Sequence, residues 1–424
     1  MKEKHARYLF LFSVAFLAYL TGVLTGAFEL PPYKLVSSSI RDVAGFVIHW
    51  KNDLGIEPTR HLYRGQKSRT VWNIVDPQRM SKGLRVVASV TPSHEALYGV
   101  RLFDQDGNEL HYWPVHYDRL DPDGRSPNNI FLHGFSVFED GAIVVNFDRG
   151  GALAKIDACG NTLWKLGGGF HHLVNRSYDG SIWAWQYRTD YTFDHWLVQI
   201  DPVSGDFLRR ISLIEDIILK PDQMGIFGVL RFDEVTPSRY QSDPFHPNDV
   251  EILGPDKSDA FPEFGTGDIM ISLRSLNLVA VLDSESLKAK WYQHGPWHRQ
   301  HDPDFQPDGT ITVFDNRLDL GQSQIVRIDP LSGEWASLFR GSDEIPFYTR
   351  MRGQHQLLEN GNLLLTPANS GRVLEVSPQG KLVWEYQNVF DETRNGVVSM
   401  AMLVPEDFFA PGALTCPSRL STGG

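Results

Sequence analysis

The sequence predicts an all-β fold, a six-bladed β-propeller that follows an N-terminal transmembrane helix. Three observations predict it: short apolar strands alternate with glycine turns, hairpin pairs recur every roughly 40 to 60 residues, and one uncharged apolar run stands at the start. Units of four strands at this period are typical of propeller blades. Because one such unit cannot bury both of its faces, several stack around a central axis.

One repeated phrase consists of an apolar strand with an acidic end, a glycine turn and an aromatic strand. Its six copies reach their aromatic strands at Trp113, Trp164, Phe207, Trp291, Trp335 and Trp384. A second hairpin precedes most copies, and a histidine stands at its start: His133, His172, His246, His301 and His355. Aspartate–glycine and asparagine–glycine dipeptides between alternating strands are a strong hairpin signal. Residues 211–240 fit no strand pattern, so we expect them to form an excursion over one face.

The N-terminal segment predicts a membrane helix. Residues 8–28 carry no charge and follow Lys2, Lys4 and Arg7. At a rise of about 1.5 Å per residue, this run spans the roughly 30 Å hydrocarbon core. The basic flank predicts a cytoplasmic N-terminus and translocation of everything after residue 30. The small residues Thr25-Gly26-Ala27 leave a cleaved signal peptide as the alternative.

We therefore expect four regions along the chain. They are an uncleaved anchor at 1–30, a stalk or packing segment at 31–82, the propeller at 83–410 and a tail at 411–424. An exported protein can hold disulfides, and the chain has two cysteines, Cys159 and Cys416. The sequence leaves open whether they form a bond.

Composition excludes one class of partner. The chain has 40 basic against 52 acidic residues, a net charge of −12, whereas a nucleic-acid partner requires a basic face. A hydrophobic share of 42% suffices for a large core.

The histidines occupy one repeated position. Equivalent positions of different blades converge on the axis of a propeller, so the five histidines named above are expected at one channel mouth. Each buried imidazole needs hydrogen-bond partners. Any one of them alone is best interpreted as a structural residue, but the set favours a functional cluster.

Several motifs resemble those of the bacterial arylsulfotransferases, which are periplasmic six-bladed propellers. The resemblance covers roughly residues 130–390. It rests on His171-His172, His246-Pro247-Asn248-Asp249, Ile271-Ser272-Leu273-Arg274, Gln300-His301-Asp302, Phe314-Asp315-Asn316, Gln354-His355 and Ser370-Gly371-Arg372-Val373-Leu374-Glu375.

The resemblance implies an enzyme that moves a sulfuryl group from a phenolic sulfate to a phenolic acceptor by a ping-pong mechanism. It implies no cofactor, no metal and no nucleotide sulfate donor, only small-molecule aryl substrates. The implied catalytic residues are His301, which becomes sulfated, with His246, Arg274 and His172; the implied substrate-binding residues are Asn248, His171 and His355. Which of His171 and His172 faces the pocket stays open, although the offset to Asp179-Gly180 favours His172. The implied location is the inner membrane, crossed once, with the catalytic domain in the periplasm.

These residue types suit the chemistry. Sulfuryl transfer needs in-line geometry and donors around the equatorial oxygens, as phosphoryl transfer does. Arg274 offers a planar, permanently charged fork. Neutral imidazole is a competent nucleophile because its pKa is about 6.5.

Three other interpretations compete. His294, His298 and His301 have metal-like spacing, but Gly295-Pro296 disfavours the helix that would align the first two. Asp302-Pro303-Asp304 suggests calcium, although aspartate is also common in turns. A non-catalytic, membrane-tethered propeller that acts as a binding or assembly scaffold is the alternative from another class. The donor, the acceptor and the oligomeric state stay open.

Overall fold

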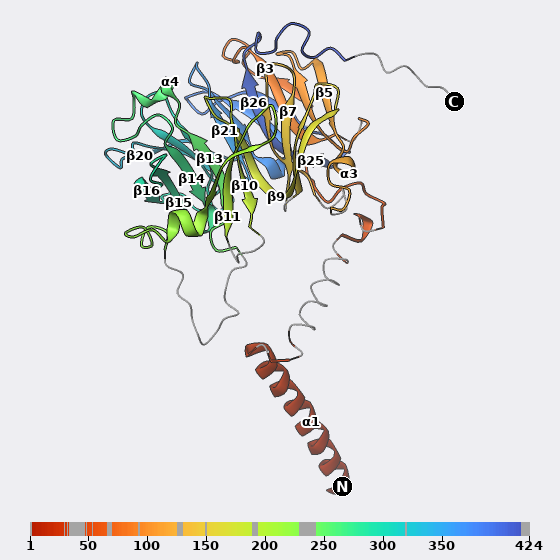
Figure 1. Ribbon diagram of the computed structural model, residues 1–424. Helices are drawn as coiled ribbons and strands as arrows, with labels where there is room; N and C mark the ends of the chain where they lie inside the picture. Colours follow the sequence, from red (N-terminus) through yellow and green to blue (C-terminus); the bar gives the residue numbers. More distant parts are fainter. Residues whose placement is uncertain are drawn as a thin grey trace. The chain divides into compact units, whose positions relative to one another are not determined.

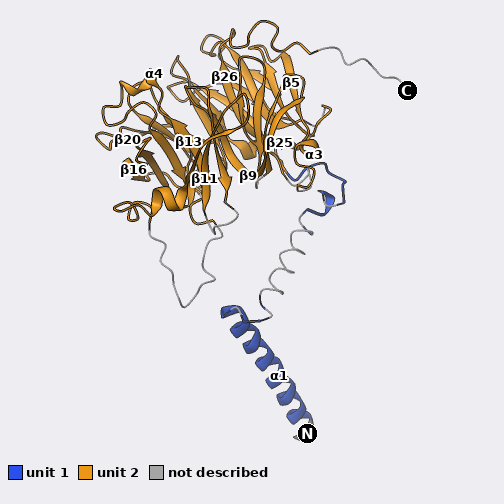
Figure 2. Cartoon of the chain, in the orientation of Figure 1, with its two compact units in different colours: residues 1–60, 232–240 blue, residues 61–231, 241–424 orange. Residues whose placement is uncertain are grey.

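The computed structural model describes most of the chain as strands and turns. The described residues are 2–28, 30–31, 33, 47, 49–52, 54–65, 70–91, 94–124, 130–148, 151–188, 194–228, 243–318 and 320–416. The chain forms two compact units, residues 1–60 with 232–240 and residues 61–231 with 241–424 (Figure 2). We describe each unit by itself.

Unit 1 contains the long helix α1 (Lys2–Ala27), drawn in red in Figure 1. Its stretch Lys4–Ala27 is long and apolar enough to cross a membrane, and none of it is buried within the structure. The expected apolar N-terminal helix is therefore present. Its length and composition fit both a membrane anchor and a signal sequence.

Unit 2 is an all-β, propeller-like arrangement of antiparallel sheets (Figure 1). One sheet has the order β26 (Val398–Val404), β3 (Leu84–Val90), β4 (Tyr98–Phe103), β5 (Glu109–Val115). Two more sheets of four strands follow chain order: β13 (Pro247–Ile252), β14 (Ile269–Leu273), β15 (Leu278–Leu282), β16 (Ala289–His294), and β17 (His301–Phe305), β18 (Ile311–Asp315), β19 (Gln324–Ile328), β20 (Trp335–Arg340).

The remaining strands form a larger, a five-stranded and a two-stranded sheet. The five-stranded sheet has the order β2 (Trp72–Ile74), β24 (Leu382–Gln387), β23 (Arg372–Val376), β22 (Leu363–Thr366), β21 (Gln354–Leu357). The pair is β1 (Leu62–Arg64) with β25 (Arg394–Gly396). The largest of these sheets has seven strands in the order β12 (Phe207–Ser212), β11 (His195–Ile200), β10 (Ile182–Tyr187), β9 (Thr162–Arg176), β8 (Gly151–Ile156), β7 (Ile143–Phe147), β6 (Leu132–Val137).

Short helices lie in the connections. They are α3 (Tyr117–Leu120), the π-helix η2 (Leu213–Ile218), α4 (Pro255–Ser258) and the 3-10 helices η4 (Arg274–Leu276) and η5 (Ala368–Ser370). The segment expected to leave the strand pattern begins as the end of β12 and continues into η2; residues 229–240 of it lie outside the described residues.

The long strand β9 explains why the separate sheets do not simply match the predicted blades. Its first part pairs with β8, as in Thr162↔Ile156, and its last part pairs with β10, as in Arg176↔Ile182. Two units of four strands are therefore merged into one sheet of seven.

Glycine turns form several of the expected hairpins. Asp308-Gly309 joins β17 to β18, and Gly309 has a φ of +80°. A Cβ atom there would lie 2.4 Å from the carbonyl oxygen of Ala260, so only glycine fits. The strands themselves are apolar runs: every residue of β14 and β15 is buried, whereas the edge strand β16 alternates between half-buried and exposed residues.

Among the described residues, the core consists of six apolar clusters of buried side chains, arranged between neighbouring strand groups. One cluster, for example, joins Ile271 and Ala280 of β14 and β15 to Trp185 of β10. Another joins Val279 to Val313 and Val326 of the next sheet. Stacking of neighbouring sheets therefore supplies the core, as the repeats predict.

The first strand of each strand group lies innermost. These inner strands are β26, β6, the end of β9 (170–176), β13, β17 and β21. Each contacts the next in that order, and β21 contacts β26 again, so they form a closed ring. The ring brings residues from distant parts of the sequence together.

The propeller-like unit begins earlier than the sequence analysis placed it. The two units divide after Arg60, and Asn73 of β2 pairs with Glu385 of β24. Residues 61–82 therefore belong to unit 2 rather than to a separate stalk. The reason is that β2 extends the edge of a sheet and belongs to no repeat.

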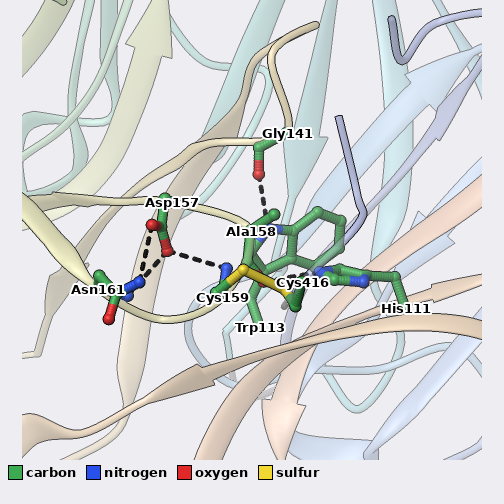
Figure 3. Close-up of a disulfide and its surroundings, with 8 residues drawn as sticks. All are labelled: His111, Trp113, Gly141, Asp157, Ala158, Cys159, Asn161 and Cys416. Carbon is green, nitrogen blue, oxygen red and sulfur yellow. Dashed lines mark hydrogen bonds between the residues drawn. A yellow bond between two sulfur atoms is a disulfide. The ribbon is translucent and has the colours of Figure 1, made fainter. Parts of the chain in front are cut away.

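A disulfide joins Cys159, in the turn between β8 and β9, to Cys416 near the end of the described chain (Figure 3). Their Cα atoms are 5.5 Å apart. The turn is shaped by Asp157, whose Oδ1 accepts a hydrogen bond from the backbone N–H of Cys159 at 2.8 Å. The bond ties the C-terminal segment to the body of unit 2.

Candidate active site

The inner strands place one side chain each around a common pocket. The lining residues that come from them are Ser399 (β26), His133 (β6), His172 (β9), Asn248 (β13), His301 (β17) and Gln354 (β21). Leu173, Arg352 and Gly353 complete the lining. The structure therefore gathers one polar residue from each of the six inner strands.

β-Bulges direct most of these side chains. The pairing register shifts at His133, His172, Asn248 and Ser399, each of which is an extra residue opposite its neighbouring strand, and it shifts next to His301. A bulge turns side chains out of the regular alternation, and bulges are frequent near active sites. The strand β21 has no such shift.

The backbone around these positions is strained. His172, His246 and Asp302 have φ values of +61°, +51° and +53°. A left-handed conformation costs a non-glycine residue about 1–3 kcal/mol and persists only where the surrounding structure enforces it. Of these three residues, His172 lines the pocket, His246 packs against it, and Asp302 lines the second cavity.

His301 is held in a defined orientation. Its Nδ1 lies 2.7 Å from Oδ1 of Asn316, whose Nδ2 donates to the carbonyl oxygens of Thr349 and Arg352 at 3.0 and 2.6 Å. Those two bonds fix the amide, so Oδ1 is the atom that faces the imidazole. Nδ1 therefore carries the proton and Nε2 carries the lone pair. The backbone N–H of Arg352 points at that Nε2 from 3.2 Å.

His301 is uncharged at neutral pH. Burial lowers its pKa well below the usual value, and the positive charge of Arg274 lowers it further. The hydrogen bond to Asn316 opposes these effects without cancelling them. A neutral imidazole with an oriented lone pair is a nucleophile.

The other histidines of the cluster pack against His172. Its ring centroid lies 4.5 Å from that of His133, 4.8 Å from His246 and 4.9 Å from His171. Burial lowers the pKa of His172 and of His171 well below the usual value, and that of His133 to about 3. Neighbouring imidazoles add to the effect on His172 because each would repel its positive form.

Arg274 and Arg352 carry unused donors. The buried Nε of Arg274 and Nη1 of Arg352 have no hydrogen-bond partner among the described residues. Burial, followed by repulsion from Arg299, lowers the pKa of Arg274 to about 10, so it remains charged at neutral pH. The guanidinium of Arg352 lies 3.6 Å from the ring centroid of Phe131 and lines the pocket. Two cations with free donors favour an anionic ligand.

Asn248 also points toward this centre. Its Nδ2 donates to the carbonyl oxygen of Gln300 at 2.8 Å, which orients the side chain. Its Oδ1 is buried without a hydrogen-bond partner among the described residues. That oxygen is free to accept a hydrogen bond from a ligand hydroxyl.

A chain of polar groups lies behind His172. Nδ1 of His172 lies 2.7 Å from Nδ1 of His171, and Nε2 of His171 lies 3.1 Å from Nδ1 of His195. Nε2 of His195 lies 3.6 Å from Oδ1 of Asp243. The other oxygen of Asp243 lies 2.7 Å from Nδ1 of His246. Asp243 therefore connects to two histidines of the cluster.

The sequence analysis missed His195, Asp243, Arg352 and Asn316 as site residues. His195 opens β11, which is not an inner strand, and its repeat equivalents are not histidines. Asp243 has one sequence signal, its position three residues before His246 on the same turn. Asn316 belongs to the motif Phe314-Asp315-Asn316, but its contact with His301 requires the pairing of β17 with β18.

Four of the expected site residues are not among the lining residues of this pocket: His246, Arg274, His171 and His355. His355 borders a second cavity, where its Nδ1 lies 2.8 Å from Oδ2 of Asp302 and its Nε2 lies 2.7 Å from Oγ1 of Thr312. His355 is therefore not placed beside His301 in this pocket, and its role in substrate binding stays a prediction. The physical reason is register: without a bulge in β21, Gln354 faces the pocket in its place. His171 lies buried behind His172, so His172 is the member of the pair that faces the pocket.

Potential metal ligands lie in the second cavity. Among the described residues, Asp302, Asp304 and His355 place their ligand atoms within 4.8 Å of one another. Burial and repulsion from Asp302 raise the pKa of Asp304 well above its usual value, and Lys257 opposes this rise. Both ring nitrogens of His355 already have protein partners. His294, from the metal-like spacing, directs its ring nitrogens at the carbonyl oxygens of Leu276 and Ile226.

Comparisons with known proteins give one family. A family model described as arylsulfotransferase (ASST) matches residues 135–389, more than half of the chain. No curated protein matches the sequence. The matched range contains all the proposed histidines except His133.

Solved structures give only distant likenesses. A protein of unknown function from Bacteroides caccae is 12% identical, with a TM-score of 0.48 over 76% of this chain and 98% of that one. A catalytically inactive virginiamycin B lyase from Staphylococcus aureus is 11% identical, with a TM-score of 0.40 over 74% and 88%. Hydrazine synthase from Kuenenia stuttgartiensis is 15% identical, with a TM-score of 0.41 over 66% and 71%. At these values they carry no argument about function.

The buried histidines make stability depend on pH. The pKa of His133 is about 3 in the folded protein against 6.5 unfolded, so the unfolded chain binds more protons below pH 6.5. The contribution of neutral His133 to the free energy of unfolding is complete above pH 6.5 and is lost as pH falls. Between pH 6.5 and 5, the free energy of unfolding falls by roughly 2 kcal/mol because of this one group. We expect His133→Gln to flatten the decline of the unfolding free energy over this range by that amount. Urea unfolding of both proteins in detergent measures it.

The variant comparison separates His133 from other titrating groups. The carboxyl groups of the second cavity have raised pKa values and change stability in the opposite direction, but they are the same in both proteins. Parallel pH dependences of wild type and His133→Gln would show that the imidazole of His133 is not buried in its neutral form.

Proposed function

This chain belongs to the arylsulfotransferase family, and we propose that it transfers a sulfuryl group from a phenolic sulfate ester to a phenolic acceptor. The observation that carries the proposal is the setting of His301. Its Nε2 lone pair is oriented by Asn316, and it lies in a pocket shared with His172 and Asn248. The two arginines with unused donors supply the affinity for a sulfate ester anion.

In the first half-reaction, Nε2 of His301 attacks the sulfur atom. The N–S bond forms as the bond between sulfur and the aryl oxygen breaks, and the electron pair leaves on the phenolate. The backbone N–H of Arg352, 3.2 Å from Nε2, gives up this contact and becomes available to a sulfuryl oxygen. The products are a sulfohistidine and a phenolate, and because the first product leaves before the acceptor reacts, the kinetics are ping-pong.

Charge on the sulfuryl oxygens is balanced by Arg274, His246 and Arg352. The free Nε of Arg274 is a charged donor, and such donors strengthen in a water-poor site. In the second half-reaction, an acceptor phenol loses its proton to a neighbouring histidine, its oxygen attacks sulfur, and His301 is restored. His172 is the histidine that we assign to this proton transfer, because it faces the pocket beside His301.

The proposal includes six blades. Six inner strands form the ring and six apolar clusters separate the strand groups, which supports division of β9 between two blades. An experimental structure in which β8 and β10 lie in one blade would contradict this count.

Incubation with an aryl sulfate tests the nucleophile. We expect intact-mass measurement to show one added SO3 group on the wild type, and peptide mapping to place it on His301. His301→Asn abolishes the adduct because no nucleophilic nitrogen remains. His94→Asn, a variant of a histidine outside the pocket, keeps it. An adduct that persists in His301→Asn contradicts the assignment, and no adduct with any aryl sulfate would leave the scaffold alternative.

Replacement of Arg274 tests its two effects on the first half-reaction. We expect Arg274→Met to lower kcat/KM for the donor roughly 100- to 1,000-fold, the usual effect of losing one donor to a developing charge. Because Arg274 lowers the pKa of His301, its loss raises that pKa, and the acid limb of the pH–rate profile moves to higher pH. Arg274→Lys keeps the charge and should leave the limb in place. An acid limb that stays in place in Arg274→Met would show that Arg274 does not lower the pKa of His301.

We further propose that α1 is a single-pass anchor in the inner membrane and that unit 2 lies in the periplasm. Basic residues at the start of α1 and the disulfide support this placement. When cells are lysed in a thiol-alkylating reagent, we expect Cys159 and Cys416 of the full chain to remain unmodified. A variant that lacks residues 1–28 and stays in the cytoplasm should carry two alkyl groups. Alkylation of both cysteines in the full chain would contradict the placement.

A further inference from the structure

The chain of polar groups behind His172 is more ordered than packing requires. His171 and His195 are 1% and 2% exposed, and each uses both ring nitrogens in the chain toward Asp243. Buried polar side chains cost stability unless they are paired, and apolar residues fill a core at lower cost. Three consecutive contacts from the pocket to one carboxylate therefore call for a reason other than core packing.

The carboxylate of Asp243 favours one set of hydrogen-bond directions in this chain. Burial opposes ionisation of Asp243, but contacts with His195 and His246 outweigh it and lower its pKa well below the usual value. Its Oδ1 lies 3.6 Å from Nε2 of His195, and the negative charge at this distance favours a proton on that nitrogen. When Nε2 of His195 carries the ring proton, Nδ1 is an acceptor.

The proton on His195 also sets the proton positions on His171 and His172, which lie nearer the pocket. Nε2 of His171 donates to Nδ1 of His195, which leaves Nδ1 of His171 as an acceptor. Nδ1 of His172 donates to it, and the lone pair of His172 is then on Nε2. In its neutral state the chain therefore presents His172 as a base. A proton added at Nε2 can be passed on, bond by bond, until the positive charge lies on His195 beside Asp243.

We propose that His171, His195 and Asp243 form a proton relay that holds the proton of the phenol between the two half-reactions. The proposal rests on the proposed function. In the second half-reaction the acceptor phenol gives its proton to Nε2 of His172, and the relay moves the charge to the His195–Asp243 pair. In the next first half-reaction the same proton returns through His172 to the departing phenolate. No proton is gained or lost over a full cycle.

Other ionisable groups near the relay do not replace this route. His133, His246 and His301 face His172 from the neighbouring inner strands, and they disfavour a positive charge on it. Arg274 and His246 face Asp243 and favour its ionised form. Asp194 accepts the backbone N–H of His195, and its carboxylate is occupied by Ser212 and Arg188. Asp243, which lies between His195 and His246, is therefore the carboxylate that stabilises the stored charge at the far end of the relay.

His195→Gln interrupts the relay with little change in geometry. A glutamine side chain can donate to Asp243 and accept from His171, but its amide cannot pass a proton on. Tyr187→Leu is the matched packing control, because Tyr187 packs against the rings of both His171 and His195. Circular dichroism and thermal unfolding in detergent establish that each variant is folded.

The test measures how the rate of sulfation of His301 depends on the acidity of the leaving phenol. The rate of sulfation of His301 is measured by rapid quench with phenyl sulfate and with 4-nitrophenyl sulfate, whose phenol is much more acidic. We expect His195→Gln to slow the reaction of phenyl sulfate roughly 100-fold, the usual value of general acid catalysis. The nitrophenyl ester, whose phenolate leaves without a proton, should change less than about 3-fold. Tyr187→Leu should affect both donors equally.

The outcomes separate the relay from the proposed function. If His195→Gln lowers the sulfation rate equally with both donors, or with neither, the relay is overturned. Sulfation of His301 in the wild type would still support the transferase. No sulfation of the wild type by any donor overturns both. If His195→Gln does not fold, Asp243→Asn removes the charge at the end of the relay and must show the same selective loss with phenyl sulfate.

Discussion

The pairing of β26 with β3 closes the ring, and the site depends on this closure. Ala401 pairs with Val87, so the last strand of the chain completes the sheet that the third strand begins. Only a closed ring of inner strands brings Ser399 of β26 and His133 of β6 to the pocket that contains His301. The disulfide between Cys159 and Cys416 acts on the same region, since it fixes the segment that follows β26.

Once the ring is closed, bulges decide what the inner strands present. Regular alternation would direct every second residue of a strand to the channel. At His172 and Asn248 an extra residue breaks the alternation, so the selected side chain faces the pocket at the strand entrance. The interior then keeps the imidazoles of His172 and His301 neutral, because burial disfavours their charged forms. A nucleophilic nitrogen at neutral pH is thus a consequence of where the fold places it.

The sequence predicts the repeating elements well and the site only in part. Hairpins such as β17–β18 have local signals, and the histidines that begin them recur at one position. His355 lies in a different cavity from His301 because a bulge is not visible in the repeat: β17 has one, β21 does not, and a shift of one residue turns the side chain to the other face. The proposed role of His195 and Asp243 was not predictable from the repeats. It depends on contacts that join β11 and the turn before β13 to histidines of the inner strands.

The two cavities beside β17 differ in charged lining residues, and this difference bears on where the proposed sulfate ester binds. Adjacent residues of β17 face opposite ways: His301 shares its pocket with Arg352, whereas Asp302 shares the second cavity with Glu251 and Asp304. Burial, together with repulsion from Asp302, raises the pKa values of Glu251 and Asp304. The proposed sulfate ester is an anion, and the two cations that line the second cavity, Arg176 and Lys257, are already paired with Glu139 and Glu251. The pocket of His301 instead offers Nη1 of Arg352, which has no hydrogen-bond partner among the described residues.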